Sequence, residues 1–199
     1  MEERTITVYE FNELGEQAQE KVIYWINSWL DMDLFEEGVA EDLKELFPNS
    51  SLELQYSLSH SQGDGVNIYG DLWINDVLAL EEIKNQFTEK QLARIQHYTE
   101  EFLYKVNLPY NRRYGYCTAS SIDFAGELIN ELEMADYHNI DVELIEDFEN
   151  AIKVQMMIVC SKFEKMGYEE IDYMHSKEFA AEMCEANEYK FLENGTVFI

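Results

Sequence analysis

The chain has 199 residues, with 41 Asp and Glu against 14 Lys and Arg, which gives a formal net charge of −27. Such an acidic body repels nucleic acid and anionic membrane surfaces and attracts basic protein surfaces, which argues against direct nucleic-acid or membrane binding. Disorder is excluded as well, because 46% of the residues are hydrophobic and 14% are aromatic. We therefore expect a folded, very acidic protein with a substantial core.

The first half of the chain predicts a strand, two helices and a hairpin. β-branched and aromatic residues favour the strand, and apolar residues on one helical face favour the helices, the second of which ends at Pro48. Alternating apolar and polar residues around the turn Gly63-Asp64-Gly65 predict the hairpin. In chain order, these elements are expected at 5–10, 15–30, 36–47, 52–58 and 66–74.

The second half predicts mostly helices. Two helices follow the hairpin, and Thr88 and Gln91 form a capping box at the start of the second. The Tyr-rich stretch 103–122 reads as extended structure and loop. Further helices are expected at 123–137, at 142–165 with Gly167 as C-cap, and from Ser176, before a closing Asn194-Gly195 hairpin within 189–199.

In the long helix, apolar residues recur at alternating steps of three and four. These inward positions are Ile145, Phe148, Ile152, Met156, Val159 and Phe163. Part of this helix is also a candidate dimer seam. Together the elements predict an α+β fold, with an antiparallel sheet built from hairpins, including the C-terminal one, packed with several helices.

Domain organisation and compartment follow from composition. With only two prolines and no linker-like stretch, we expect a single compact domain over 1–199, or two lobes meeting near 103–122. The three cysteines, Cys117, Cys160 and Cys184, form no C-x-x-C pair, so neither a disulfide framework nor a cysteine zinc site is expected. The start of the chain lacks the pattern of a signal peptide. These features favour the cytoplasm.

Several predicted helices carry carboxylates three or four residues apart on one face, where like charges repel. These stripes are Glu37, Glu41 and Glu45; Glu127 and Glu131; and Glu178, Glu182 and Glu185. Their spacing is comparable to that of phosphates along a nucleic-acid strand. One hypothesis is that the stripes imitate DNA and enter a basic groove of a partner. The alternative is that they are solvated helix faces of an acidic protein.

One segment has basic residues and no acidic ones, unlike the rest of the chain. Residues 102–122 contain no Asp or Glu, and they include Tyr110, Arg112, Arg113 and Tyr114. Tyr and Arg anchor protein interfaces, and basic residues among aromatics can also bind single-stranded nucleic acid. The interpretation that we favour here is a strand whose arginines pair with nearby carboxylates.

The sequence contains little that indicates catalysis. Ser59, His60 and Ser61 are adjacent, but neighbours in a strand point to opposite faces. No G-x-S-x-G, P-loop, G-x-G-x-x-G or H-E-x-x-H pattern is present. The acidic run from Asp31 to Glu37 lacks the full EF-hand loop. We therefore expect no catalytic residue, metal site or cofactor, and a protein that is not an enzyme.

Three stretches resemble a group of small bacteriophage and mobile-element proteins. They are Tyr9-Glu10-Phe11-Asn12-Glu13-Leu14 with the helix after it, Tyr56 to Val66 with its Ser-Gln-Gly-Asp-Gly turn, and the ending 187–199. The resemblance covers about a third of the chain and carries no catalytic signature. Some acidic proteins of this origin are anti-CRISPR proteins, which block RNA-guided nucleases, often by imitating DNA. The resemblance thus implies phage origin and a host bacterial cell.

The leading hypothesis is a phage-type anti-defence protein, an anti-CRISPR inhibitor that binds a host RNA-guided or DNA-binding nuclease. Its acidic faces would imitate DNA and block binding of the target. A second hypothesis is an acidic regulatory module that binds protein through the Tyr/Arg-rich segment 104–116. A third is an enzyme with a carboxylate-based site. A homodimer is a further candidate assembly.

Overall fold

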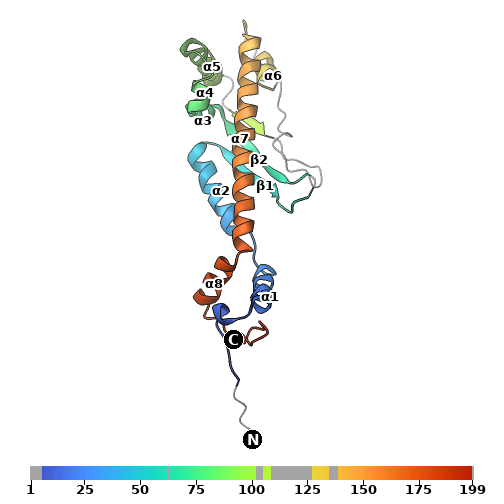
Figure 1. The fold of residues 1–199 in the computed structure, drawn as a ribbon. Coiled ribbons are helices and arrows are strands. Elements are labelled where there is room, and N and C mark those ends of the chain that lie inside the picture. The colour runs from blue at the N-terminus through green and yellow to red at the C-terminus, as the bar shows by residue number, and fades with distance from the viewer. Residues whose placement is uncertain (1–5, 62, 102–104, 109–126, 135–138, 199) are drawn as a thin grey trace. The chain divides into compact units, whose positions relative to one another are not determined.

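The computed structural model describes residues 6–61, 63–101, 105–108, 127–134 and 139–198 (Figure 1). They form helices and a three-stranded antiparallel sheet, which confirms the predicted α+β fold class. The chain divides into two compact units. The terminal unit comprises Met1–Asp33 and Gly167–Ile199, and the central unit comprises Leu34–Met166. Of the stretch 103–122, where two lobes were expected to meet, only 105–108 is described.

The elements follow one another in the order of their labels in Figure 1, with a short 3-10 helix, η1, at the start. They are η1 (Phe11–Glu13), α1 (Glu16–Asn27), α2 (Asp33–Leu46), β1 (Ser51–Ser57), β2 (Gly65–Trp73), α3 (Ile74–Ala79), α4 (Glu81–Lys84), α5 (Glu89–Glu101), β3 (Lys105–Leu108), α6 (Glu127–Met134), α7 (Val142–Met174) and α8 (Lys177–Ala186).

The sheet of the central unit has the strand order β1-β2-β3, and each strand is antiparallel to its neighbour. The hairpin β1–β2 is the one predicted from the alternating pattern, with Leu54 opposite Ile68. The middle strand β2 is the most buried, because it has a partner on both edges and carries Val66 and Ile68 into the core. At its other end β3 pairs with β2, and Leu108 lies opposite Gly70.

Helices α2 and α7 bury their apolar faces in this unit as the sequence predicts. Val39 and Leu43 of α2 are almost fully buried, and so are all six predicted inward positions of α7. The Cys160 sulfur of α7 accepts a hydrogen bond from the backbone of Ile68 in β2, so α7 packs against β2. The Lys162 ammonium of α7 lies 3.1 Å from an Asp42 carboxylate oxygen of α2.

The predicted end of the long helix is wrong. Gly167 is buried inside α7, and the helix continues to Met174. A glycine inside a helix costs only about 1 kcal/mol relative to alanine, which the packing of a long helix can offset. The helix ends where Ser176 begins α8, since the Ser176 hydroxyl accepts a hydrogen bond from the Phe179 N–H at 3.1 Å.

The connection between β2 and β3 also differs from the prediction, with three helices where we expected two. Leu80 has an extended backbone (φ −69°, ψ 133°) that separates α3 from the short α4. The predicted capping box at α5 is confirmed. The Thr88 N–H donates to the Gln91 side-chain oxygen at 2.9 Å, and the Gln91 N–H donates to the Thr88 hydroxyl at 3.4 Å.

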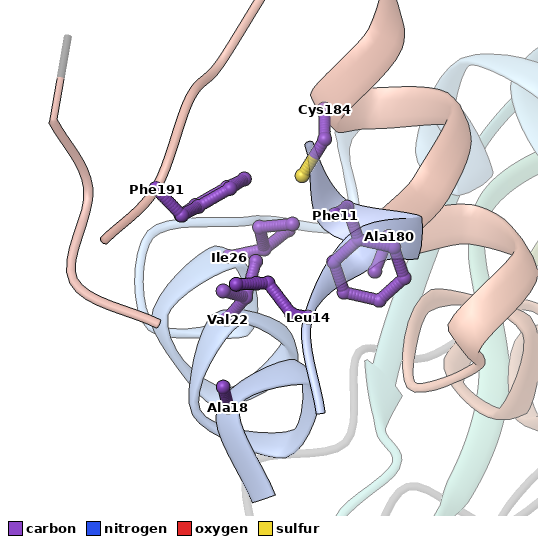
Figure 2. Packing of buried hydrophobic residues seen from close by; sticks show 8 residues of the cluster. All are labelled: Phe11, Leu14, Ala18, Val22, Ile26, Ala180, Cys184 and Phe191. Atoms are coloured by element: carbon purple, nitrogen blue, oxygen red, sulfur yellow. The ribbon is translucent and has the colours of Figure 1, made fainter. Parts of the chain in front are cut away.

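The terminal unit has its own hydrophobic core, shown in Figure 2. Side chains from η1, α1, α8 and the closing segment meet there, and Val22, Ile26 and Phe191 are fully buried. The predicted first strand is wrong for the described residues 6–10. Only Tyr9 pairs, in an isolated antiparallel bridge with Phe191, because η1 turns the chain so that Phe11 enters the core.

The closing hairpin forms with a different turn from the one predicted. The Gly195 N–H donates to the Leu192 carbonyl at 2.9 Å, so the central residues of the turn are Glu193 and Asn194. Gly195 follows the turn with φ +83°, as in a hairpin loop with a glycine bulge. The pairing is limited to the isolated bridge Phe191–Val197 and is not part of the three-stranded sheet.

Two glycines give a matched test of this fold. Gly70 has φ +115°, and a Cβ there would lie 2.2 Å from the Ser51 carbonyl oxygen, whereas a Cβ on Gly38 of α2 would meet nothing within 4 Å. We expect Gly70→Ala to lower the free energy of unfolding by about 2 kcal/mol or more. Gly38→Ala should raise it by up to about 1 kcal/mol. Urea denaturation measures both, and equal effects would contradict the assigned conformation of Gly70.

Candidate protein-interaction surface

The best-described acidic surface lies on α8 and the end of α7, in the terminal unit. Ala180 and Cys184 bury one side of α8 in the core (Figure 2). The opposite side presents Glu178, Glu182 and Glu185, and all three side chains are exposed. The helical period therefore puts the three carboxylates of the predicted stripe in water, as the sequence indicates. We call these three residues the α8 stripe.

Tyr173, at the end of α7, connects the α8 stripe to an aromatic pair. Its hydroxyl donates a hydrogen bond to Glu182 Oε2 at 2.7 Å, and its ring packs edge-on against Phe179 at 5.3 Å between centroids. The hydrogen bond to Glu182 is the main cause that raises the pKa of Tyr173, and the charges of Glu178 and Glu170 raise it further.

The described ion pairs of the terminal unit do not neutralise the α8 stripe. Lys177 Nζ lies 3.7 Å from Glu16 Oε1 of α1, and Lys190 Nζ lies 2.7 Å from Glu10 Oε1. That second contact is the main cause that lowers the pKa of Glu10 and raises the pKa of Lys190. Among the residues that the structure describes, both lysines thus pair with carboxylates outside the stripe.

A hollow of about 540 Å³ borders the stripe at the C-terminal end of α8. Glu10, Glu185, Glu188 and Lys190 line it together with apolar parts of Phe11 and of its neighbours. Acidic groups therefore extend the negative surface around the end of α8. Glu188 has φ +56°, an unusual conformation for a glutamate, directly after α8 ends.

The predicted stripe on α2 lies in the central unit. Glu37, Glu41 and Glu45 are all exposed, and Lys44 is exposed among them. The acidic neighbour Asp42, by contrast, pairs with Lys162 of α7. The α2 stripe is thus a second acidic helix face, with a cation of its own.

The remaining predicted site residues cannot be placed. Glu127 and Glu131 belong to α6, but their side chains are outside the description. Tyr110, Arg112, Arg113 and Tyr114 lie outside the described residues altogether. The hypothesis that the Tyr/Arg segment binds a partner therefore stays a prediction.

The Ser59-His60-Ser61 segment is a structural turn. Asp64 accepts hydrogen bonds from the Ser61 N–H at 2.6 Å, the Ser59 N–H at 2.6 Å and the Ser57 hydroxyl at 2.7 Å. These bonds, that of the Ser61 N–H above all, lower the pKa of Asp64. His60 is exposed in the left-handed region at φ +57°. Asp64 is thus the residue that holds the loop of the hairpin together.

Two cysteines are described, and both are buried. Burial raises the pKa of the Cys160 thiol to about 12 and that of the Cys184 thiol to about 11. Since the thiolate is the reactive form, these two thiols are poor nucleophiles at neutral pH. Their environment is that of small apolar core residues.

Two buried carboxylates hold the fold of the central unit. Asp76 accepts hydrogen bonds from the N–H and side-chain amide of Asn49, at 3.0 and 2.7 Å, and from the Ser50 hydroxyl at 2.7 Å. Glu149 of α7 accepts a bond from the Leu128 N–H at 2.8 Å, in the first turn of α6. Each carboxylate thus bonds a backbone N–H of another segment, and Glu149 satisfies a donor of the buried Leu128 that would otherwise lack a partner.

Within the described ranges, no group of three or more His, Cys, Asp or Glu side chains is arranged to hold a metal ion. The helices there also include none that combines the length and the apolar character needed to cross a bilayer.

Comparison with known proteins adds no relative. No family model, no curated protein and no solved structure matches this chain.

The helical spacing of the sequence predicts the three carboxylates of the α8 stripe, but it does not predict that Tyr173 contacts them. Nothing in its neighbourhood marked Tyr173 as a partner of Glu182, because the two residues belong to different helices whose junction at Ser176 brings them together. A tyrosine one helical turn before a predicted N-cap, with acidic residues on both sides, is the signal that could have found it.

The raised pKa of Tyr173 is testable by substitution. Glu182→Gln removes the charged acceptor of the Tyr173 hydrogen bond, so we expect the pKa of Tyr173 to fall towards its ordinary value of 10.0. Glu178→Gln should lower it less. Because the folded state holds this proton more tightly, the associated stability is present below pH 10 and is lost as pH rises through the folded pKa.

The measurement is an NMR titration of the Tyr173 ring carbon in protein labelled with ¹³C at the tyrosine ζ position. Glu188→Gln serves as the control, since Glu188 is not among the causes of the shift. An unchanged pKa in Glu182→Gln would show that the hydrogen bond is absent in solution.

Proposed function

We propose that this chain is a phage-type anti-defence protein, an anti-CRISPR inhibitor whose α8 stripe enters the DNA-binding groove of a host RNA-guided or DNA-binding nuclease. The observation that carries the proposal is the set of three exposed carboxylates on one side of α8, none of which has a cation partner among the described residues. The resemblance of three stretches of the chain to phage and mobile-element proteins agrees with it.

The spacing of the stripe supports imitation of a phosphate backbone. Residues four apart on a helix are separated by about 6 Å along its axis. Alternate phosphates of one DNA strand lie about 6.8 Å apart along the duplex axis. Glu178 and Glu182 therefore repeat at nearly the interval at which a basic groove binds alternate phosphates.

Energetics also favour a functional role for the stripe. Like charges at these positions destabilise a helix by about 0.2–0.5 kcal/mol per pair, a cost that lysines in the same positions would remove. Tyr173 donates a hydrogen bond to Glu182, and the charges of Glu170 and Glu178 also raise its pKa, so these carboxylates lie around one position. A basic partner groove would relieve this repulsion and would be steered towards it from a distance.

The proposed mechanism is competitive. The acidic face occupies the Lys/Arg-lined cleft that would otherwise hold target DNA, so that inhibitor and DNA exclude one another. Tyr173 and Phe179 lie beside the carboxylates and offer an aromatic contact of the kind that anchors protein interfaces. Binding should be fast and should weaken as salt rises.

Charge reversal tests the role of the stripe. We expect the triple variant Glu178→Lys, Glu182→Lys, Glu185→Lys to bind its nuclease partner at least about tenfold more weakly, because attraction to a basic groove becomes repulsion. The matched control reverses Glu82, Glu89 and Glu133, three exposed residues scattered over α4, α5 and α6. It makes the same change in net charge and should bind nearly as the wild type does.

The partner is first identified by a pull-down from host lysate at low and moderate salt, with mass spectrometry of the bound proteins. Competition with duplex DNA then shows whether the partner binds the chain through its DNA site. Circular dichroism establishes that both variants are folded. A folded triple variant with wild-type affinity would remove the α8 stripe from the mechanism. A salt-resistant partner without a nucleic-acid groove would favour the regulatory hypothesis, and recovery of no partner would reopen the search for a substrate.

A further inference from the structure

A further hollow, of about 360 Å³, lies along α1 in the terminal unit. Most of the residues that line it recur at steps of three and four, so they share one side of α1. The lining consists of Glu20, Ile23, Tyr24 and Asn27, with Ser28 at the end of the helix and His175 beyond the end of α7. The hollow shares no residue with the one at the end of α8. We call it the α1 hollow.

An exposed aromatic ring forms part of the α1 hollow. Tyr24 is 79% exposed, whereas Ile23 beside it is half-buried and packs against the core of the terminal unit. The hollow thus combines an apolar surface with a ring that is largely open to solvent. The face of an aromatic ring carries a partial negative charge, so it attracts cations, and arginine more often than lysine.

Asn27 has a buried oxygen without a hydrogen-bond donor. Its side-chain Oδ1 is buried, and no described residue donates to it. A buried acceptor without a donor costs free energy, which a ligand with an N–H group would recover. The Asn27 side-chain nitrogen makes no hydrogen bond among the described residues either. A half turn of the amide therefore exchanges oxygen and nitrogen without breaking a hydrogen bond, and the oxygen can face a ligand.

Two further acceptors line the hollow, Glu20 and His175. The Glu20 side chain is exposed and takes part in none of the ion pairs among the described residues. His175 Nδ1 lies 2.8 Å from the Ile171 carbonyl oxygen, which can only accept, so Nδ1 carries the proton. Nε2 of the neutral ring is then an acceptor. The lining includes neither lysine nor arginine, so it offers acceptors but no cation.

We propose that the α1 hollow binds an arginine side chain of a protein partner. The guanidinium is planar and always charged, and it carries five N–H donors in a fixed fork. It can stack on the Tyr24 ring while it donates to Asn27 Oδ1 and to the Glu20 carboxylate. Its aliphatic stem would lie against Ile23. A lysine ammonium is a compact point charge that cannot stack in this way, so the lining selects arginine.

Net charge favours the same occupant. The chain carries a formal net charge of −27, so basic protein surfaces are attracted to it and acidic ones are repelled. A single arginine contact is weak, so an isolated arginine peptide should bind with a dissociation constant on the order of 1 mM. The cleft of the proposed nuclease would supply arginines of this kind. The inference rests on the lining of the α1 hollow, however, and stands or falls without the proposed function.

Titration of the full chain with short peptides tests the proposal. The peptides are acetyl-Gly-Arg-Gly-amide, acetyl-Gly-Lys-Gly-amide and the uncharged citrulline analogue of the first. NMR follows the Tyr24 ring carbon and the Asn27 side-chain amide. We expect the arginine peptide to shift both signals, with a dissociation constant at least about fivefold lower than that of the lysine peptide. Because these two peptides have equal charge, general attraction to the acidic chain cancels in the comparison.

Substitutions locate the binding site, with the Asn27 signal as the readout. Tyr24→Leu keeps an apolar side chain but removes the ring, so its affinity for the arginine peptide should fall at least about threefold. Tyr24→Phe keeps the ring and should bind as the wild type does. Glu20→Gln should also weaken binding. Glu193→Gln is its matched control, because it makes the same change in charge at an exposed position outside the hollow.

Equal dissociation constants for the arginine and lysine peptides, or for the arginine and citrulline peptides, would overturn the proposal. A Tyr24→Leu variant that binds the arginine peptide like the wild type would overturn it as well. Weaker binding in Tyr24→Leu and Glu20→Gln, but not in Glu193→Gln, would support it. Since no nuclease enters the experiment, neither result decides whether the α8 stripe imitates DNA.

Discussion

The structure depends on one constraint, which is that a chain with 41 acidic and 14 basic residues must keep its charges hydrated while it buries a core. Helices meet this constraint because their period separates an apolar side from an acidic side. On α8, Ala180 and Cys184 enter the core while Glu178 and Glu182 stay in water. Charge repulsion on the outer side is then tolerated because packing on the inner side holds the helix in place. The acidic faces are a consequence of the fold, and the feature that calls for a function is that the α8 stripe has no cation partner among the described residues.

Periodic features of the fold could be predicted from the sequence. The inward phase of α7, the hairpin around Asp64 and the capping box at Thr88 are local patterns, and local physics decides them. The predictions that are wrong concern positions where tertiary packing, and not the local sequence pattern, determines the backbone conformation. Gly167 stays helical because it is buried within a long helix, and the predicted first strand is replaced by a single bridge from Tyr9 because η1 sends Phe11 into the core.

In the candidate site, too, local patterns could be predicted and tertiary contacts could not. Helical spacing was enough to locate the α8 stripe, but its contact with Tyr173 depends on the junction of two helices, which no local pattern encodes. The exposure of Val154 and Ile158 could not be predicted either, because the apolar pattern of α7 does not say which positions a neighbouring element covers.

The central claim is that binding to the nuclease partner and binding of DNA exclude one another. Fluorescence anisotropy of a labelled target duplex bound to that nuclease tests this claim most directly, with the chain added at increasing concentration and at several salt concentrations. The account predicts that the chain releases the duplex completely, and that release needs more chain as salt rises. Formation of a ternary complex, in which the duplex stays bound while the chain binds elsewhere, would contradict it.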